Sequence, residues 1–310
     1  MRQSNTTTLA RPALPPALPL GRAARRLAVL TFQDVTDRQA FAAQVERLQR
    51  TAAPVSLDDV ERALSGGAPL PPHAVLLTFE RGHRSAATEA LPVLAARRVP
   101  GVAFVVPGLV DTDRPYWWQE ARFLVEQGGR ARGLSGRTPG DVVAALSALP
   151  DPDRRRSLEE LRVTARRPAP GTPQLTAADL LALRDGGVEL GNHTLSHARL
   201  DTCDGYVVRE EVAGGHERLT RLTGEQPRTF AYPDAVFDER VAPLLRGLAY
   251  RSAFVSDGTL FDLRGAGGGQ PDPLRISRLK VTPGTSRGMF DGVLSGWTPT
   301  ARRLRGAVAV

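Results

Sequence analysis

Two histidines with three residues between them are the clearest chemical signal in this chain. His193 and His197 stand in the stretch GNHTLSH, and on one turn of helix their rings would face the same way. Neutral imidazoles at this spacing suit a divalent metal, most commonly zinc. A hydrogen-bonding pair at a helix start, or two plain surface histidines, would give the same pattern, so the pair alone leaves these alternatives open.

Three further polar groups directly follow apolar runs. Glu80 and Arg81 follow AVLLTF, and Asp34 comes shortly after LAVLTF. Tyr232 and Asp234 belong to the stretch FAYPD. In parallel α/β proteins, functional side chains gather at the carboxyl ends of strands. We therefore expect these groups to meet the two histidines on one rim of the fold.

The elements that must position these residues are short, continuous apolar runs with helical patterns between them. Residues 27–32, 74–79 and 102–106 predict strands buried on both faces. Ser56 and Asp59 predict the capped start of a helix. Strand–helix alternation indicates an α/β fold with a parallel sheet, and about seven repeats favour a closed barrel. Weaker strand patterns occur at residues 188–191, 229–232, 252–256 and 276–281.

The chain divides into four parts by composition. Residues 1–26 are rich in proline and carry no long apolar run, which predicts a flexible arm. Residues 27–300 hold the predicted barrel, and residues 301–310 are expected to be a tail. Residues 128–175 are polar and rich in arginine and proline, so we expect an insertion with one or two surface helices. A solvated excursion, a lid or a partner surface would explain it.

Composition excludes several classes of protein. The 310 residues are 41% hydrophobic, enough for a sizeable core, and the net charge is +8. Arginine carries nearly all of this charge, without aromatic context, so we expect no nucleic-acid partner. The single cysteine, Cys203, excludes an internal disulfide, and no stretch is apolar enough to span a membrane. We expect a soluble, cytoplasmic protein.

The motifs together resemble the polysaccharide deacetylase family, carbohydrate esterase family 4, with its NodB homology domain. LLTFERGHRS is similar to the family's first motif, usually Thr-Phe-Asp-Asp-Gly, and GVELGNHTLSHARL is similar to the second. RTFAYPDAVFDE resembles the third. The resemblance implies a distorted (β/α)7 barrel of the TIM-like kind. It also implies hydrolysis of an N-acetyl, or sometimes O-acetyl, group on a sugar, with water activated by a divalent metal.

The resemblance assigns roles, and the chain departs from two of them. Glu80 stands where the family has its general base, and Arg81 stands where it has a metal-binding aspartate. A guanidinium has no lone pair to donate. At about 4 Å it would be repelled by a divalent ion by roughly 8 kcal/mol at an effective dielectric of 20. The implied metal, zinc if any, would therefore be held by His193 and His197, with Asp34 as a substitute ligand, or be absent.

Other readings of the same residues remain open. Glu80 and Arg81 could form an ion pair with each other, or Arg81 could pair with Asp234. The third motif implies that a backbone N–H near Tyr232 and Asp234 binds the oxyanion. No histidine follows His216, so the late histidine that often protonates the leaving amine has no counterpart.

Three hypotheses follow for function. The first is an N-deacetylase that acts on an N-acetylated sugar or polysaccharide intermediate. The second is a catalytically inactive relative that binds a glycan or a protein partner. The third is a metal-free hydrolase in which Arg81 replaces the metal as the electrophile. The sugar and the oligomeric state do not follow from the sequence.

Overall fold

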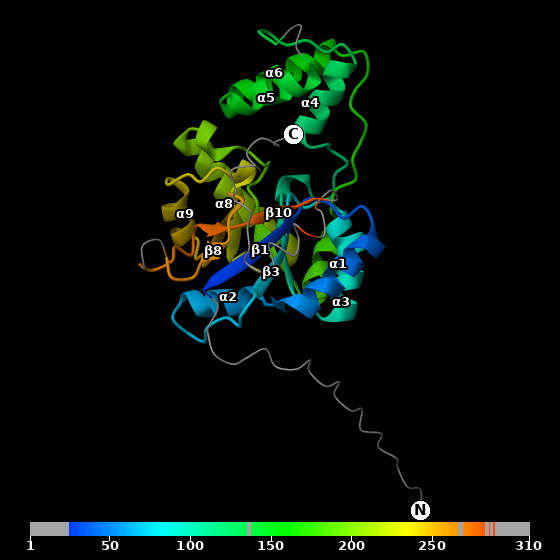
Figure 1. Cartoon of the computed structure of the whole chain (residues 1–310). Coiled ribbons are helices and arrows are strands. Elements are labelled where there is room, and N and C mark those ends of the chain that lie inside the picture. Colours follow the sequence, from blue (N-terminus) through cyan, green and yellow to red (C-terminus); the bar gives the residue numbers. More distant parts are fainter. Residues whose placement is uncertain (1–24, 135–137, 266–268, 283–284, 286–287, 289–310) are drawn as a thin grey trace, which may run out of the picture.

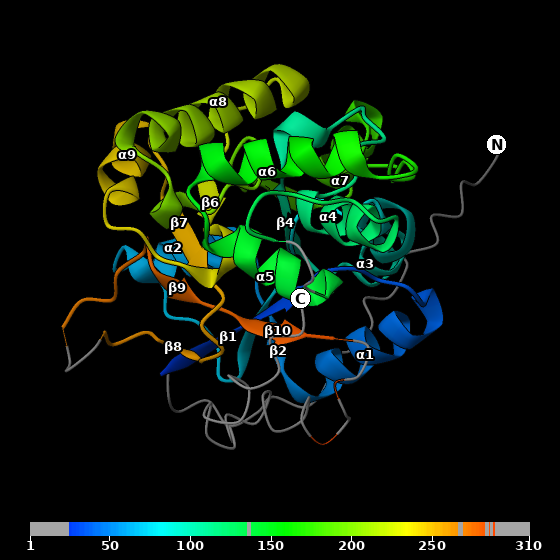
Figure 2. The ribbon, with the colours of Figure 1, turned by 90° about the horizontal axis from the view of Figure 1, so that it is seen from above.

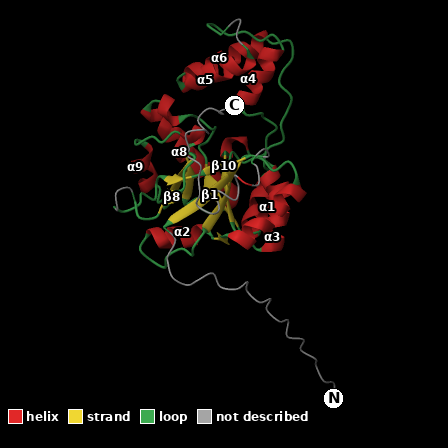
Figure 3. Ribbon diagram, viewed as in Figure 1, coloured by secondary structure: helices red, strands yellow, loops and turns green. Residues whose placement is uncertain are grey.

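The structure, a computed structural model, describes residues 25–134, 138–265, 269–282, 285 and 288. The described residues leave out all but residues 25 and 26 of the predicted arm (1–26). They also leave out residues 289–300 and the predicted tail (301–310). Within them, a sheet wraps around a central axis and helices surround it, as Figure 3 shows in yellow and red.

The main strands run parallel to one another and follow the predicted apolar runs. Along the sheet the order is β10-β1-β3-β4-β5-β6-β7-β9, so each strand largely neighbours the next along the chain. Two short strands are attached at the side: β2 (Ala53–Pro54) pairs with β3, and β8 (Phe261–Asp262) pairs antiparallel with β1. The six principal strands are β1 (Arg26–Phe32), β3 (Ala74–Phe79), β4 (Gly101–Val105), β5 (Val188–Asn192), β6 (Thr229–Ala231) and β7 (Ser252–Val255).

One segment near the end of the described chain closes this sheet. β9 (Ile276–Ser277) pairs with β7, and β10 (Leu279–Val281) pairs with β1 on the other side. The predicted strand 276–281 is therefore split at Arg278, and its two halves join the two ends of the sheet. The predicted (β/α)7-type barrel is confirmed as a nearly closed, barrel-like sheet.

Alternation along the strands separates an inner core from an outer one. In β1, Leu27 and Val29 pack with Phe104, Phe254 and Ile276 inside the barrel. The intervening side chains of β1 pack outward against the covering helices. Because both faces of each strand are buried, the runs contain almost no polar residues.

Helices cover the outside of the barrel. α2 (Leu57–Leu64) begins with the capping box of Ser56 and Asp59 that the sequence predicts. The other covering helices are α1 (Arg38–Thr51), the π-helical turn η1 (Ala86–Ala90), α3 (Leu91–Arg97), α7 (Ala177–Asp185), α8 (Gly205–Thr223) and α9 (Val241–Gly247). None of the helices in the described ranges is both long and apolar enough to cross a membrane.

Three further helices form a separate layer over one end of the barrel. They are α4 (Trp117–Glu126), α5 (Pro139–Ala148) and α6 (Asp151–Thr164), and they share a small core of their own. α5 and α6 lie within the predicted insertion, and α4 precedes it. Figure 1 shows this layer above the sheet, and Figure 2 shows it in front of the strands in the view from above. Arg155 of α6 ties the layer to the barrel through Glu211 of α8, at 3.2 Å.

Candidate active site

A buried ion pair stands at the top of the barrel interior. Glu80 follows β3, and Arg278 lies between β9 and β10. The guanidinium of Arg278 donates to Glu80 Oε1 at 2.6 Å, and its side chain is fully buried over the ring of Phe104. Burial raises the pKa of the Glu80 carboxyl, but Arg278, followed by His193 and Arg81, more than offsets this and lowers it to about 2. Glu80 is therefore a firmly ionised, weakly basic carboxylate.

Arg81 does not pair with Glu80, contrary to one of the sequence-based hypotheses. Its guanidinium lies over the ring of Trp118 at 4.6 Å, and its Nε has no hydrogen-bond partner. The backbone at Arg81 is left-handed, with φ of 69°, and its carbonyl accepts a hydrogen bond from Tyr116 Oη at 2.7 Å. Arg81 is thus held at the rim by an aromatic ring and by its own backbone.

His193 and His197 meet near Glu80 and Arg81 at the carboxyl ends of the strands, an end of the barrel that we call the mouth. They do not lie on a helical turn. The chain from Thr194 to His197 is irregular, and Thr194 and His197 have φ of 64° and 59°. This loop brings the two rings to 4.7 Å in an edge-to-face contact, and Trp118 lies 4.8 Å from His197. The expectation of a helix was wrong because left-handed residues, rather than helical spacing, turn both rings inward.

A close contact with α8 fixes this histidine loop, defined here as residues 193–197. Leu195 N donates to Glu211 O at 2.9 Å, and the Glu211 carboxylate accepts from Ser196 N at 2.8 Å. Gly215 faces the loop so closely that a Cβ there would lie 2.5 Å from Asn192 Oδ1. Glycine is a poor residue for a helix interior, and its presence at position 215 of α8 is therefore explained by close packing against the loop and Asn192.

Both histidines are neutral in the folded protein. Burial, followed by the proximity of His197, lowers the pKa of His193 to about 3. Burial and then Arg81 lower the pKa of His197 to about 3. His193 Nδ1 contacts the carbonyl of Ala231 at 2.8 Å, while His193 Nε2 and His197 Nδ1 have no partner. Two buried imidazole nitrogens thus remain available to bond a ligand, an ion or water at the mouth.

The remaining predicted site residues are divided between the rim and the core. Asp34 is half-buried at the end of β1, and Asp234 is exposed on the turn after β6. Although part of the residue is exposed, desolvation of its carboxyl raises the pKa of Asp234, and the charge of Arg81 opposes that rise. The side chain of Tyr232 lies in the outer core under α8 and α9, and its N–H is bonded to Phe254 O at 3.0 Å. Tyr232 therefore does not offer this N–H to the mouth.

Sequence reasoning missed Arg278 and Trp118. An arginine inside an apolar strand pattern is itself a signal, because a charged side chain is buried in a barrel only with a partner. Trp118 lies in the sequence YWW, which carries no spacing that points to the mouth.

These residues supply two of the ligands that a metal site needs, but not a third. His193 and His197 each have a free ring nitrogen, which suits a divalent ion. Among the described residues, however, no group of three histidine, cysteine, aspartate or glutamate side chains is arranged to hold a metal. Glu80 is paired with Arg278, Asp34 does not complete a set, and the Arg81 cation lies close enough to His197 to lower its pKa. The residues present therefore do not fit the family's zinc centre.

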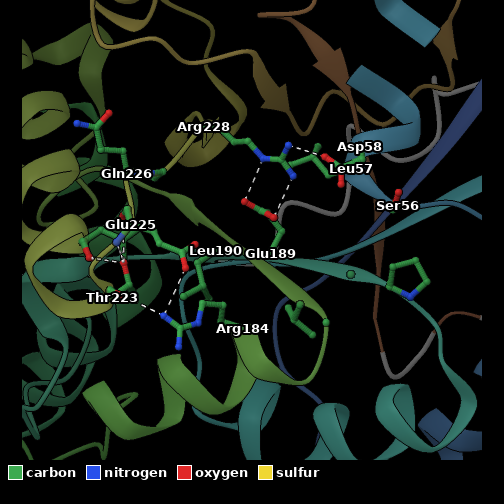
Figure 4. A pocket seen from close by; sticks show the side chains of 16 residues that line it. Ser56, Leu57, Asp58, Arg184, Glu189, Leu190, Thr223, Glu225, Gln226 and Arg228 are labelled. Atoms are coloured by element: carbon green, nitrogen blue, oxygen red, sulfur yellow. Dashed lines mark hydrogen bonds and ion pairs between the residues drawn. The ribbon is translucent and has the colours of Figure 1, made fainter. Parts of the chain in front are cut away.

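The opposite end of the barrel has a cavity of about 180 Å³ without comparable chemistry. Figure 4 shows Arg228 between Glu189 and Asp58 in its wall. Arg228 lies 3.0 Å from Glu189, and Arg184 lies 3.6 Å from Glu225. Since these charges satisfy one another at the amino ends of the strands, the cavity is a structural feature of the barrel floor.

Comparison with known proteins relates part of the chain to one family by sequence. Residues 163–253 match the sequence model of the polysaccharide deacetylase family. The poly-beta-1,6-N-acetyl-D-glucosamine N-deacetylase of Escherichia coli (strain K12) is 38% identical over 84 residues, which cover 22% of this chain and 12% of that protein. The resemblance to the family is confirmed by sequence over residues 163–253.

Solved structures extend the similarity of fold to most of the chain. The deacetylase PplD of Streptococcus pyogenes, in complex with acetate, has a TM-score of 0.59 at 14% identity and covers 88% of this chain and 99% of its own. IcaB from Ammonifex degensii has a TM-score of 0.57 at 20% identity and covers 89% of this chain and 97% of its own. At these identities the likeness concerns the fold.

Proposed function

We propose that this protein binds an N-acetylated hexosamine unit of a polysaccharide at the barrel mouth and does not hydrolyse it through the family's metal-dependent reaction. The buried pair of Glu80 and Arg278, with Arg81 beside the histidines, carries this proposal. The proposed substrate class is supported by the family match and by the E. coli relative, whose name specifies a poly-N-acetylglucosamine deacetylase.

The chemistry of the mouth suits binding better than water activation. A general base works best when its pKa lies near the working pH, and the pKa of Glu80 is lowered to about 2. The metal that would lower the pKa of water lacks a third protein ligand among the described residues. The unpartnered nitrogens of His193, His197 and Arg81 can instead hydrogen-bond an acetamido group or a sugar hydroxyl.

The test combines binding with catalysis. Isothermal titration with N-acetylglucosamine oligomers should show binding to the wild type, and acetate release should stay at background with and without added zinc. His197→Gln should weaken binding, while His73→Gln, an exposed histidine outside the mouth, should not. Zinc-dependent acetate release would overturn the proposal. Release in the presence of a chelator would instead support a metal-free hydrolase with Arg81 as the electrophile.

A further inference from the structure

A larger cavity of about 500 Å³ lies beside the mouth, between the histidine loop, the start of α4 and α6. We call it the side cavity. Its size is within the range of small-molecule sites. Its lining includes Arg114, Tyr116, Trp117, Leu195 and Ser196.

The side cavity shares a wall with the mouth. Leu195 and Ser196 line it, and both belong to the loop that carries His193 and His197. Tyr116 also lines it, and its hydroxyl holds the carbonyl of Arg81. The side cavity therefore adjoins the mouth.

Most of the charged groups around the side cavity are held in ion pairs. Arg155 lies 2.6 Å from Asp151 and 3.2 Å from Glu211, and Arg162 lies 2.7 Å from Glu120. Three of the four lining arginines, Arg154, Arg155 and Arg162, are paired with carboxylates, and Arg114 has no ion pair among the described residues. The paired carboxylates are Asp151, Glu120, Glu159 and Glu211. Three guanidinium groups thus share four carboxylates, and these ion pairs present fixed donors and acceptors, which suit neutral hydroxyl groups better than an anion.

Trp117 adds an aromatic surface and an unused donor. Its ring is half-buried, and Arg154 lies over it at 4.8 Å from the ring centre. The indole Nε1 is buried and has no hydrogen-bond partner among the described residues. A buried donor without a partner indicates a ligand or water at that place, and the flat, apolar face of a sugar ring packs well on an aromatic ring.

We propose that the side cavity binds a second, neutral sugar unit of the polysaccharide whose N-acetylated unit occupies the mouth. This inference rests on the proposed function, because it assigns the neighbouring position on the same polymer. The helical layer of α4 to α6 then contributes one wall of the binding groove rather than serving as a solvated excursion.

The experiment compares oligomer lengths. Neutral N-acetylglucosamine oligomers of one to six units are titrated into the wild type and into Trp117→Ala, Trp117→Phe and Arg114→Ala. We expect the wild type to bind the hexamer more tightly than the monomer. The Trp117→Ala and Arg114→Ala variants should each lose about tenfold in hexamer affinity, because the loss of one contact worth about 1.4 kcal/mol weakens binding tenfold. Monomer affinity should not change.

The controls separate folding, site and ligand. Arg156→Ala removes an exposed arginine of α6 that pairs with Asp153 at 3.0 Å, and it should leave the length dependence intact. Trp117→Phe keeps an aromatic ring but removes the N–H together with the five-membered ring of the indole, so it loses less packing than Trp117→Ala. Equal hexamer affinity in the wild type and all three variants would overturn the inference, and so would tighter binding of an oligo-uronic acid. Failure of the proposed function gives a different result: the monomer would then not bind to the wild type, or would bind equally well to His197→Gln.

Discussion

Arg278 and Glu80 form a hydrogen-bonded ion pair inside the barrel, 2.6 Å apart, although 198 residues separate them along the chain. Arg278 is also at the point where β9 ends and β10 begins, so the residue that neutralises Glu80 lies in the segment that closes the sheet. The charge at the mouth and the closure of the barrel are therefore linked through one side chain.

Removing Arg278 should cost far more stability than removing Arg81. Arg278→Met leaves Glu80 buried without a partner, and we expect a loss of about 3–5 kcal/mol in the free energy of unfolding. Arg81→Met removes a guanidinium that stacks on Trp118 at the rim, which should cost about 1 kcal/mol or less. Urea unfolding of both variants measures the difference. The reverse order would mean that Arg81, not Arg278, is the structural partner of Glu80.

The histidine loop should depend on the missing side chain of Gly215. In Gly215→Ala, the new Cβ would lie 2.5 Å from Asn192 Oδ1 and 3.1 Å from Leu195 N, so Asn192 must shift and the loop beside it must adjust. We expect a loss of about 1–3 kcal/mol from overpacking, although alanine is the better helix former. Gly205→Ala in the same helix meets nothing within 4 Å and is the matched control. Thermal melting of the two variants checks this, and equal melting temperatures would mean that the loop tolerates displacement.

Acid should destabilise the protein through the two histidines. The pKa of each falls from an ordinary 6.5 to about 3 on folding, so below pH 6.5 the unfolded chain binds protons that the folded one does not. The free energy of unfolding should therefore fall as the pH drops from 6.5, by about 1.4 kcal/mol per pH unit for each histidine. Below pH 4.5 Glu80 adds to the loss, because its pKa is lowered to about 2.

The contribution of the histidines can be isolated by substitution. His197→Gln should reduce the slope between pH 6 and pH 4.5 by the share of one buried histidine, about 1.4 kcal/mol per pH unit. Urea unfolding at several pH values gives the slopes. A flat profile in the wild type over this range would contradict neutral, buried histidines.

Zinc should stabilise the protein only after Arg81 is replaced. Arg81→Asp adds a carboxylate beside the two histidines, and aspartate tolerates the left-handed backbone at this position better than arginine does. We expect added zinc to raise the melting temperature of this variant and of Glu80→Asp with Arg81→Asp, but not that of the wild type. Arg81→Asn has the same shape without the charge and is the control. If the wild type retains one zinc per chain after dialysis against a chelator, the proposed loss of the metal site is wrong.

The sequence predicts the scaffold better than the site. The runs 27–32, 74–79 and 102–106 closely match β1, β3 and β4, because strands buried on both faces must be continuously apolar. The convergence of Glu80, Arg81, His193 and His197 also follows, since parallel strands place their carboxyl ends together. Local spacing could not predict the loop between the histidines, which depends on left-handed residues and on contact with α8.

The sequence also did not predict which distant residue pairs with Glu80. Glu80 had an adjacent arginine, and proximity along the chain favoured Arg81 as its partner. The barrel instead points Glu80 inward to Arg278, while the left-handed backbone at Arg81 directs that side chain toward Trp118. Tyr232 was misplaced for a similar reason, because alternation in β6 turns its ring into the outer core.

The closing segment also sets an order of events during synthesis. Glu80 emerges from the ribosome 198 residues before Arg278, an interval of about 10–40 s at ordinary translation rates. Until residues 276–281 are available, β1 and β7 are open sheet edges, and the Glu80 carboxylate has no buried counter-charge. Closing the barrel and neutralising its interior are thus one late step of folding, and the nascent chain must keep two strand edges from pairing with other chains until that step is complete.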